Sequence, residues 1–288
     1  MSTAVGAFLE GWRRALRAPA VTTGLAAMTI LIAVLFDRSL DELRADRPQT
    51  PLTGDQLRSL SAYVLLWMFL TGGVLDRFAR ARPIRAAAFF AACGEYGVRF
   101  LRLGLIIGPL YWAVGAWLYP YLFGTIWGRW VNDLTTQRDA ITVRVVLYAM
   151  LVLVLAMIGL ISAYAQVRTV VEDRRSVIGT VGAAIRFIRR RPLRILGLLF
   201  LNVFGVAAVA RLWYSAAPTP GDSDMYTFFV TLLFVVLFVW ARMAWMAAEV
   251  AFFQGELAHA TYTAAPLPTW PDSPAAEALE NLTKRSNL

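Results

Sequence analysis

The sequence predicts an all-α polytopic membrane protein, and two observations lead to this prediction. Hydrophobic residues make up 58% of the 288 positions and charged residues only 16%, so the chain cannot cover its apolar surface as a soluble globule. Apolar segments long enough to cross a bilayer also alternate with arginine-rich segments, which favour the cytoplasmic side. We therefore expect one membrane domain, residues 1–259, with six transmembrane helices in three parallel hairpin repeats, each preceded by a cytoplasmic amphipathic helix.

Charge and rare residues argue against several classes of function. The net charge is +9, but the basic residues flank apolar segments and do not form a separate basic domain, so we predict no nucleic-acid partner. Cys93 and His259 are the single cysteine and the single histidine, which excludes an intrachain disulfide and a paired Cys/His metal site. Serine nucleophiles have no base nearby in the sequence, and the acids gather in a loop. We therefore predict no enzyme, no catalytic residue and no cofactor.

The first expected unit begins with a short N-terminal amphipathic helix. Its side chains Arg14 and Arg17 lie opposite an apolar stripe, so the helix should lie on the inner leaflet. The stripe consists of Val5, Phe8, Leu9, Trp12 and Leu16. The first span follows at about residues 20–36 and leads into an outer loop that is rich in acids. The second span returns at about residues 60–75 and ends in small residues, which permit close helix contact.

The second expected unit starts with a separate amphipathic helix over residues 86–102, whose apolar stripe lies opposite its charged side chains. The third span covers about residues 103–127. Within it, Pro120 should kink the helix beside a cluster of Trp and Tyr side chains that is typical of a membrane interface. The fourth span covers about residues 141–166.

The third expected unit carries an amphipathic helix over residues 177–190, after which Pro192 turns the chain into the fifth span, about residues 195–213. The sixth span covers about residues 226–250. Its periodic apolar pattern continues for 34 residues, or about 51 Å, whereas a bilayer core is only about 30 Å thick. This helix should therefore tilt or extend past the inner face, and the proline-rich residues 260–288 should form a mostly disordered cytoplasmic tail.

An arginine pair with three-residue spacing recurs before each hairpin, which indicates an internal repeat. Arg99 follows Arg14 by 85 residues, and Arg186 follows Arg99 by 87 residues. Because each unit enters and leaves on the same side, the repeats would be parallel. The alternative is that the preference of arginine for the inner side produced this pattern without a common origin.

Four polar residues at the inner ends of the spans form a candidate polar cluster. Arg242 is the most notable, because an arginine at the centre of a span costs roughly 2.5 to 3.5 kcal/mol. Glu249 follows seven residues later on a similar face, and Asp76 and Gln166 occupy comparable positions in the other units. These side chains could line a polar cavity. In the alternative interpretation, Arg242 extends to the inner interface, and we expect it to contact either Glu249 or lipid headgroups.

The amphipathic helices also supply candidate contacts for lipid headgroups, because basic residues beside a span gain roughly 1 kcal/mol each near anionic lipid. Anionic membrane lipids are therefore the expected partners. The candidate residues are Arg14, Arg17, Arg99, Arg102, Arg186, Arg189 and Arg190.

Three runs of sequence carry a resemblance to known proteins: FFAACGEYGVRFLRLGLI, GGVLDRFARARP and YAQVRTVVEDRRSVIG. They resemble a set of uncharacterised bacterial six-span membrane proteins. More loosely, they are similar to the membrane domain fused to some glycerophosphodiester phosphodiesterases, although the phosphodiesterase domain has no counterpart in this sequence. The resemblance implies a multi-pass protein of the bacterial inner membrane with six spans, and it supplies no catalytic motif.

Two classes of function remain open. The first is a non-catalytic inner-membrane protein, with both termini in the cytoplasm, that binds lipids or partner proteins in envelope organisation or regulation. The alternative is a permease-like or transporter-like protein for a lipid or a small envelope molecule. A continuous polar track through the membrane would favour the alternative. The sequence instead concentrates polar groups at the inner end, which favours the first class.

Overall fold

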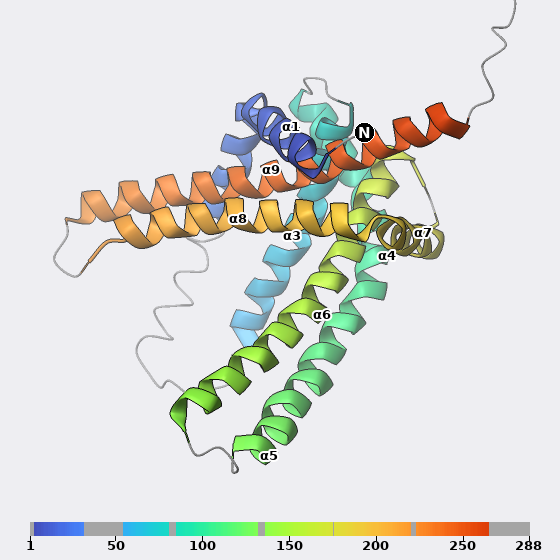
Figure 1. Cartoon of the computed structure of the whole chain (residues 1–288). Helices are drawn as coiled ribbons and strands as arrows, with labels where there is room; N and C mark the ends of the chain where they lie inside the picture. Colours follow the sequence, from blue (N-terminus) through green and yellow to red (C-terminus); the bar gives the residue numbers. More distant parts are fainter. Residues whose placement is uncertain are drawn as a thin grey trace, which may run out of the picture.

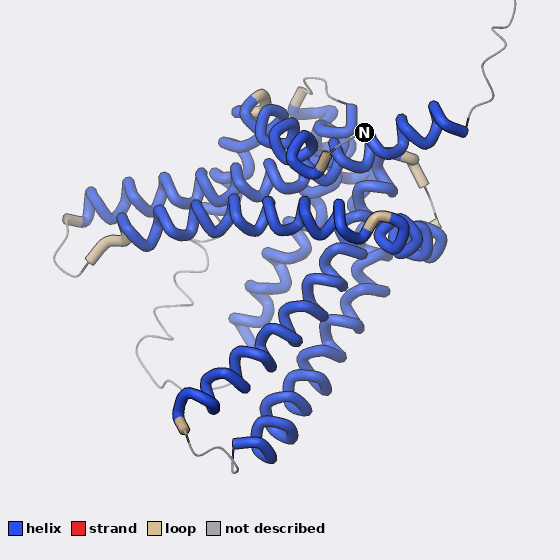
Figure 2. Tube along the Cα trace, viewed as in Figure 1, coloured by secondary structure: helices blue, strands red, loops and turns tan. Residues whose placement is uncertain are grey.

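The structure is a computed structural model that describes residues 3–31, 54–80, 85–131, 136–174, 176–219 and 223–264. Every element in these ranges is helical (Figures 1 and 2). In chain order the helices are α1 (Ala4–Leu16), a helix at Pro19–Leu31, α3 (Gly54–Arg80), α4 (Ala86–Ala113), α5 (Trp127–Val131), α6 (Gln137–Val171), α7 (Val177–Arg190), α8 (Pro192–Ala216) and α9 (Asp224–Ala264).

Five helical stretches in the described ranges are long and apolar enough to cross a membrane, which confirms an all-helical, multi-pass organisation. They are Ser61–Arg80, Ala86–Trp130, Gln137–Val171, Pro192–Ala216 and Asp224–Ala258. The segment predicted as the first span begins as the helix Pro19–Leu31, and its remaining residues, 32–36, lie outside the described residues. The predicted tail also lies largely outside them, although α9 continues as far as Ala264.

The apolar faces of the long helices point outward, as lipid contact requires. In the most apolar stretch of α6 only 11% of the residues are buried inside the protein. Aromatic side chains of the predicted interfacial belt, such as Trp112 and Trp117, are well exposed. A soluble protein would not leave such a large apolar area in water. The exposed surface therefore supports a membrane setting independently of the composition.

The predicted separate amphipathic helix over residues 86–102 is wrong, because this segment is the first part of a helix that continues to Val131. In the other two units a proline begins the next helix: Pro19 follows α1, and Pro192 follows α7. Proline favours the first turn of a helix and ends the preceding one. No proline stands at the predicted boundary near residue 102, and Pro109, which lies inside α4, does not end the helix.

Two π-helical segments, Val114–Leu118 and Tyr121–Ile126, join α4 to α5. They flank Pro120, the position at which the sequence predicted a kink. Proline removes one backbone donor, and a wider helical turn accommodates the resulting change in hydrogen bonding. The chain therefore passes Pro120 without leaving the helix.

The helices meet at one end of the molecule, which we call the arginine-rich end. It contains α1, α7, the C-terminal halves of α3, α6 and α9, and the starts of α4 and α8 (Figure 1). Most large, fully buried side chains lie here, among them Phe78, Tyr96, Tyr164 and Phe252. Away from this end the α8–α9 pair and the α4–α6 pair diverge (Figure 1). The core is thus concentrated at one end.

Each amphipathic segment packs against a membrane-spanning helix that returns to the arginine-rich end. The start of α4 packs on α3, α7 packs on α6, and α1 packs on α9. Small residues make the α1–α9 contact close, because a Cβ added at Gly11 would lie 2.4 Å from the backbone nitrogen of Ala248. In the first pairing, a Cβ at Gly73 would lie 2.6 Å from the Cys93 sulfur. The first helix of the chain therefore docks on the last.

The faces of α1 differ from the predicted arrangement. Its buried face consists of Ala7, Gly11 and Ala15, which the apolar stripe did not include. On the predicted stripe, Trp12 packs inward against Trp240 with ring centroids 4.7 Å apart, whereas Leu16 is exposed. Helix α1 is therefore built into the protein through its small residues, which permit close helix contact.

Candidate functional site

A groove of about 770 Å³ lies between α3, α6, α8 and α9. Its walls are mostly apolar, with side chains such as Val152, Leu199 and Phe238. Ligand sites combine apolar walls with a few placed polar groups, and this volume is within their usual range of about 300 to 1,000 Å³. The groove is therefore the candidate functional site.

Arg242 on α9 supplies the positive charge of the groove. Its guanidinium carbon lies 4.1 Å from the centroid of the Trp67 ring on α3, which is a cation–π contact. The Arg242 side chain is exposed within the groove and forms no ion pair with any residue that the structure describes. A cation in these apolar surroundings can therefore attract an anionic group.

Glu249 is the acidic residue of the groove and is only 5% exposed. The indole nitrogen of Trp245 donates a hydrogen bond of 2.8 Å to one Glu249 carboxylate oxygen. Arg242 and Glu249 are seven residues apart, which places them on nearly the same face of α9 but about 10.5 Å apart along its axis. The expected direct contact between them does not form in the described structure, and the headgroup contact of Arg242 stays a prediction.

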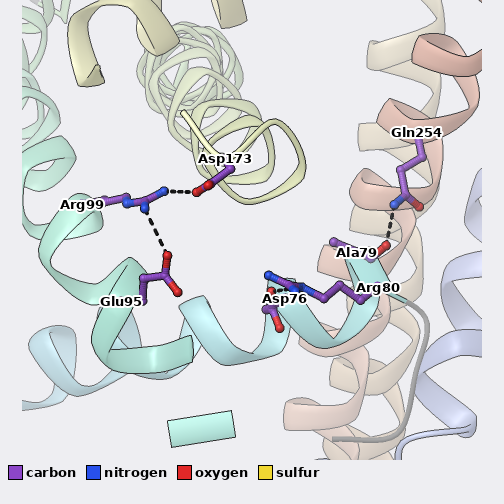
Figure 3. Close-up of polar contacts among 7 residues, drawn as sticks. All are labelled: Asp76, Ala79, Arg80, Glu95, Arg99, Asp173 and Gln254. Carbon is purple, nitrogen blue, oxygen red and sulfur yellow. Dashed lines mark hydrogen bonds and ion pairs between the residues drawn. The ribbon is translucent and has the colours of Figure 1, made fainter. Parts of the chain in front are cut away.

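Of the other two members of the predicted cluster, the structure places one in the groove. Gln166 on α6 lines it together with Arg242 and Glu249. Asp76 does not line it, although it is buried, and accepts a hydrogen bond of 2.6 Å from Arg80 one turn later on α3 (Figure 3). The groove thus unites three of the four residues, and Asp76 belongs to a separate ion pair at the arginine-rich end.

Two features near these residues were not predicted from the sequence. The aromatic partners Trp67 and Trp245 carried no sequence signal beyond their apolar helices. Glu256, only 2% exposed, forms ion pairs with Arg191 and Arg194, the latter at 3.1 Å, and so connects α9 to the start of α8. A signal did exist for Glu256, because it follows Glu249 by the same seven residues that separate Glu249 from Arg242.

Comparison with known proteins does not identify the chain. No family model, curated protein or solved structure matches it. The resemblance to bacterial six-span membrane proteins therefore stays a prediction, and any functional inference has to start from the groove and from the arginine-rich end. Within the described residues, no group of three or more His, Cys, Asp and Glu side chains is arranged to hold a metal ion.

Two of the predicted headgroup arginines already bind other groups of the protein. Arg14 donates hydrogen bonds to the carbonyl of Phe78 at 3.1 Å and to Gln254 at 2.9 Å, while Gln254 donates to the carbonyl of Ala79 at 2.7 Å. These bonds connect α1, α3 and α9, and Figure 3 shows the Gln254–Ala79 contact. Helix α1 is thus held by polar contacts as well as by small residues.

Arg99 forms a similar connection between α4 and the end of α6. It donates to Glu95 at 3.1 Å and pairs with Asp173 (Figure 3), and its guanidinium carbon lies 5.2 Å from the centroid of the Tyr96 ring. Asp173 has a φ of 48°, a left-handed conformation that aspartate tolerates at a helix end. Lipid contact by Arg14 and Arg99 stays a prediction, but both side chains hold helices together.

The remaining predicted headgroup arginines are exposed, and none forms an ion pair with a described residue. Arg186, Arg189 and Arg190, which we call the α7 arginines, lie near apolar side chains that are also exposed. Ile178 is 79% exposed and Leu193 is 83% exposed. A surface that offers both cations and apolar side chains suits the boundary between lipid headgroups and acyl chains.

Proposed function

We propose that this chain is a non-catalytic, multi-pass membrane protein that binds a phospholipid in the groove between α3, α6, α8 and α9. One observation carries the proposal: Arg242 lines an apolar groove and has no ion-pair partner among the described residues. Acyl chains fit the apolar walls, and a phosphate fits the guanidinium, which can donate two parallel hydrogen bonds to it.

The charge of Arg242 explains why an anion should occupy the groove. Placing an arginine within a span costs roughly 2.5 to 3.5 kcal/mol. The contact with Trp67 offsets part of this cost, since cation–π contacts contribute roughly 0.5 to 2 kcal/mol. A bound phosphate would offset the remainder of this cost and would give Arg242 the ion-pair partner that it lacks among the described residues.

The proposed setting is the bacterial inner membrane, with both termini in the cytoplasm and the arginine-rich end at the inner leaflet. The asymmetric distribution of arginine supports this orientation. We also propose that the chain consists of three parallel repeats. The support is the helix pairing, since in this division each amphipathic segment packs on the returning helix of the preceding unit, and α1 packs on that of the last unit.

Replacing Arg242 by Gln tests the proposed function. The matched control is Arg144→Gln, because Arg144 is also an arginine of a membrane helix that stacks on a tryptophan, Trp127, at 5.5 Å, but it does not line the groove. Each variant is purified in mild detergent, stripped of lipid and titrated with phospholipid, and bound lipid is counted by native mass spectrometry. We expect Arg242→Gln to weaken binding about tenfold, which corresponds to about 1.4 kcal/mol. Equal binding by wild type and both variants would contradict the proposal.

Lipid transport is the second candidate, because the polar groups of the groove extend some way along α9. Arg242 lies twelve residues from Gln254, or about 18 Å along the helix axis from the arginine-rich end. Vesicles carrying a fluorescent phospholipid distinguish the two functions, since a transporter accelerates the movement of the lipid between leaflets. A binding protein leaves that rate unchanged.

A further inference from the structure

The groove presents three kinds of side chain in a fixed order along α9. Phe238 contributes an apolar wall, Arg242 follows four residues later, and Glu249 follows seven residues after that, nearest the arginine-rich end. Glu249 lies only five residues before Gln254, which contacts α3 at that end. The order toward the arginine-rich end is therefore apolar, positive, negative.

The two groups line one groove, but they form no ion pair with each other in the described structure. Seven residues of an α-helix make almost two full turns, so both side chains point into the groove, about 10.5 Å apart along the axis. The ring of Trp67 faces the cation, and the indole of Trp245 donates to the carboxylate. The groove thus holds a basic and an acidic group with a space between them.

We propose that the ligand is a phospholipid with a primary ammonium headgroup, of the phosphatidylethanolamine class, its phosphate on Arg242 and its ammonium on Glu249. This inference rests on the proposed function and names its substrate class. An inner-leaflet phospholipid of this class presents acyl chains, phosphate and ammonium in that order toward the cytoplasm. The groove presents their complements in the same order toward the arginine-rich end.

Glu249 determines the selectivity between headgroups. An anionic headgroup such as glycerol phosphate offers no cation to the carboxylate, which is 5% exposed and receives one described hydrogen bond, from Trp245. Leaving a buried charge without a partner is costly. A choline headgroup offers a cation without N–H donors, so it can approach the carboxylate but cannot donate hydrogen bonds to it. The primary ammonium satisfies both the charge and the acceptor.

The test compares lipids of identical acyl chains on the lipid-stripped full chain, with binding measured by native mass spectrometry. The probes are phosphatidylethanolamine, its N-methyl and N,N-dimethyl forms, phosphatidylcholine and phosphatidylglycerol. For the wild type we expect phosphatidylethanolamine to bind at least fivefold more tightly than phosphatidylglycerol, and affinity to fall with each added methyl group. This series uses the unaltered protein, so its result does not depend on whether a variant folds.

Glu249→Gln should bring the two affinities to within twofold of each other, while binding still depends on Arg242. Asp76→Asn is the matched control, because Asp76 is an equally buried carboxylate outside the groove, and it should keep the preference of the wild type.

The outcomes separate this inference from the proposed function. If binding depends on Arg242 but phosphatidylglycerol binds as tightly as phosphatidylethanolamine, or if Glu249→Gln keeps the preference, the inferred headgroup is wrong and lipid binding stands. If Arg242→Gln binds every lipid as the wild type does, the proposed function itself is wrong.

Discussion

Replacing Gly11 by Ala should destabilise the protein, because this glycine lies where α1 crosses α9. The added Cβ would lie 2.4 Å from the backbone nitrogen of Ala248 and 2.6 Å from its Cα. Ordinary carbon contacts are about 3.5 to 4.0 Å long, so α1 would have to move away by roughly 1 to 1.5 Å. The atoms in the way belong to a helix backbone and cannot rotate aside, and the shift would also loosen the packing of Ala7 and Ala15.

The loss of stability caused by this close contact can be measured by comparing two matched variants. Gly24 lies inside the helix Pro19–Leu31, and a Cβ there would meet no atom within 4 Å. Replacing a glycine inside a helix by alanine stabilises the helix by roughly 0.5 to 1 kcal/mol, and this gain is common to Gly11→Ala and Gly24→Ala. The difference between the two variants therefore isolates the contact, and overpacking typically costs about 1 to 3 kcal/mol.

Thermal unfolding in detergent, followed by tryptophan fluorescence, measures this difference. Trp12 and Trp240 pack edge to face at the α1–α9 contact, so their emission also reports the position of α1. We expect Gly24→Ala to melt at or above the wild-type temperature and Gly11→Ala to melt several degrees below it. If Gly11→Ala melted at the same temperature as Gly24→Ala or higher, α1 would not pack closely on α9 and the reasoning would be refuted.

Three further predictions concern lipid contact, stability and topology. Replacing the three α7 arginines by Gln should remove on the order of 3 kcal/mol of attraction to anionic lipid at low salt. Less anionic lipid should then copurify with each protein molecule. An unchanged amount of lipid would mean that these arginines only set the orientation of the helix. Glu256→Gln should lower the free energy of unfolding by about 1 to 3 kcal/mol, because Arg191 and Arg194 lose their carboxylate, and unaltered melting would contradict this role. In a Cys93→Ala background, single cysteines at positions 133 and 222 should react with an impermeant maleimide from outside, and labelling only from the cytoplasmic side would contradict the proposed orientation.

Sequence patterns predicted the long helices well because membrane helices need a single property, an apolar stretch of sufficient length. They failed at residues 86–102, where the apolar stripe indicated a surface helix that would stop before the next span. Periodicity gives the face of a helix but not its end, and a proline supplies the end at Pro19 and Pro192. No proline stands at the predicted boundary near Arg102, and Pro109, seven residues later, lies inside α4 without ending it.

The candidate site was predicted in part for a similar reason. Arg242 and Glu249 were recognisable from sequence because charges within apolar helices are rare and their spacing places them on one face. Which helices would face them depended on tertiary packing, which no local pattern contains. Asp76 looked equivalent to Glu249, yet Arg80 one turn later pairs with it. The groove is completed by Gln166, which was predicted, and by Trp67, which was not.

The contact between α1 and α9 also has a consequence for the order in which the protein assembles. Gly11 and Ala248 are in close contact, although they lie 237 positions apart in the sequence. Domains fold from the N-terminus during synthesis at roughly 5 to 20 residues per second, so α1 would wait about 12 to 47 s for its docking surface. During that interval the small-residue face of α1 lacks the packing surface that α9 provides. Among the described helices, the last to be synthesised thus completes the packing of the first.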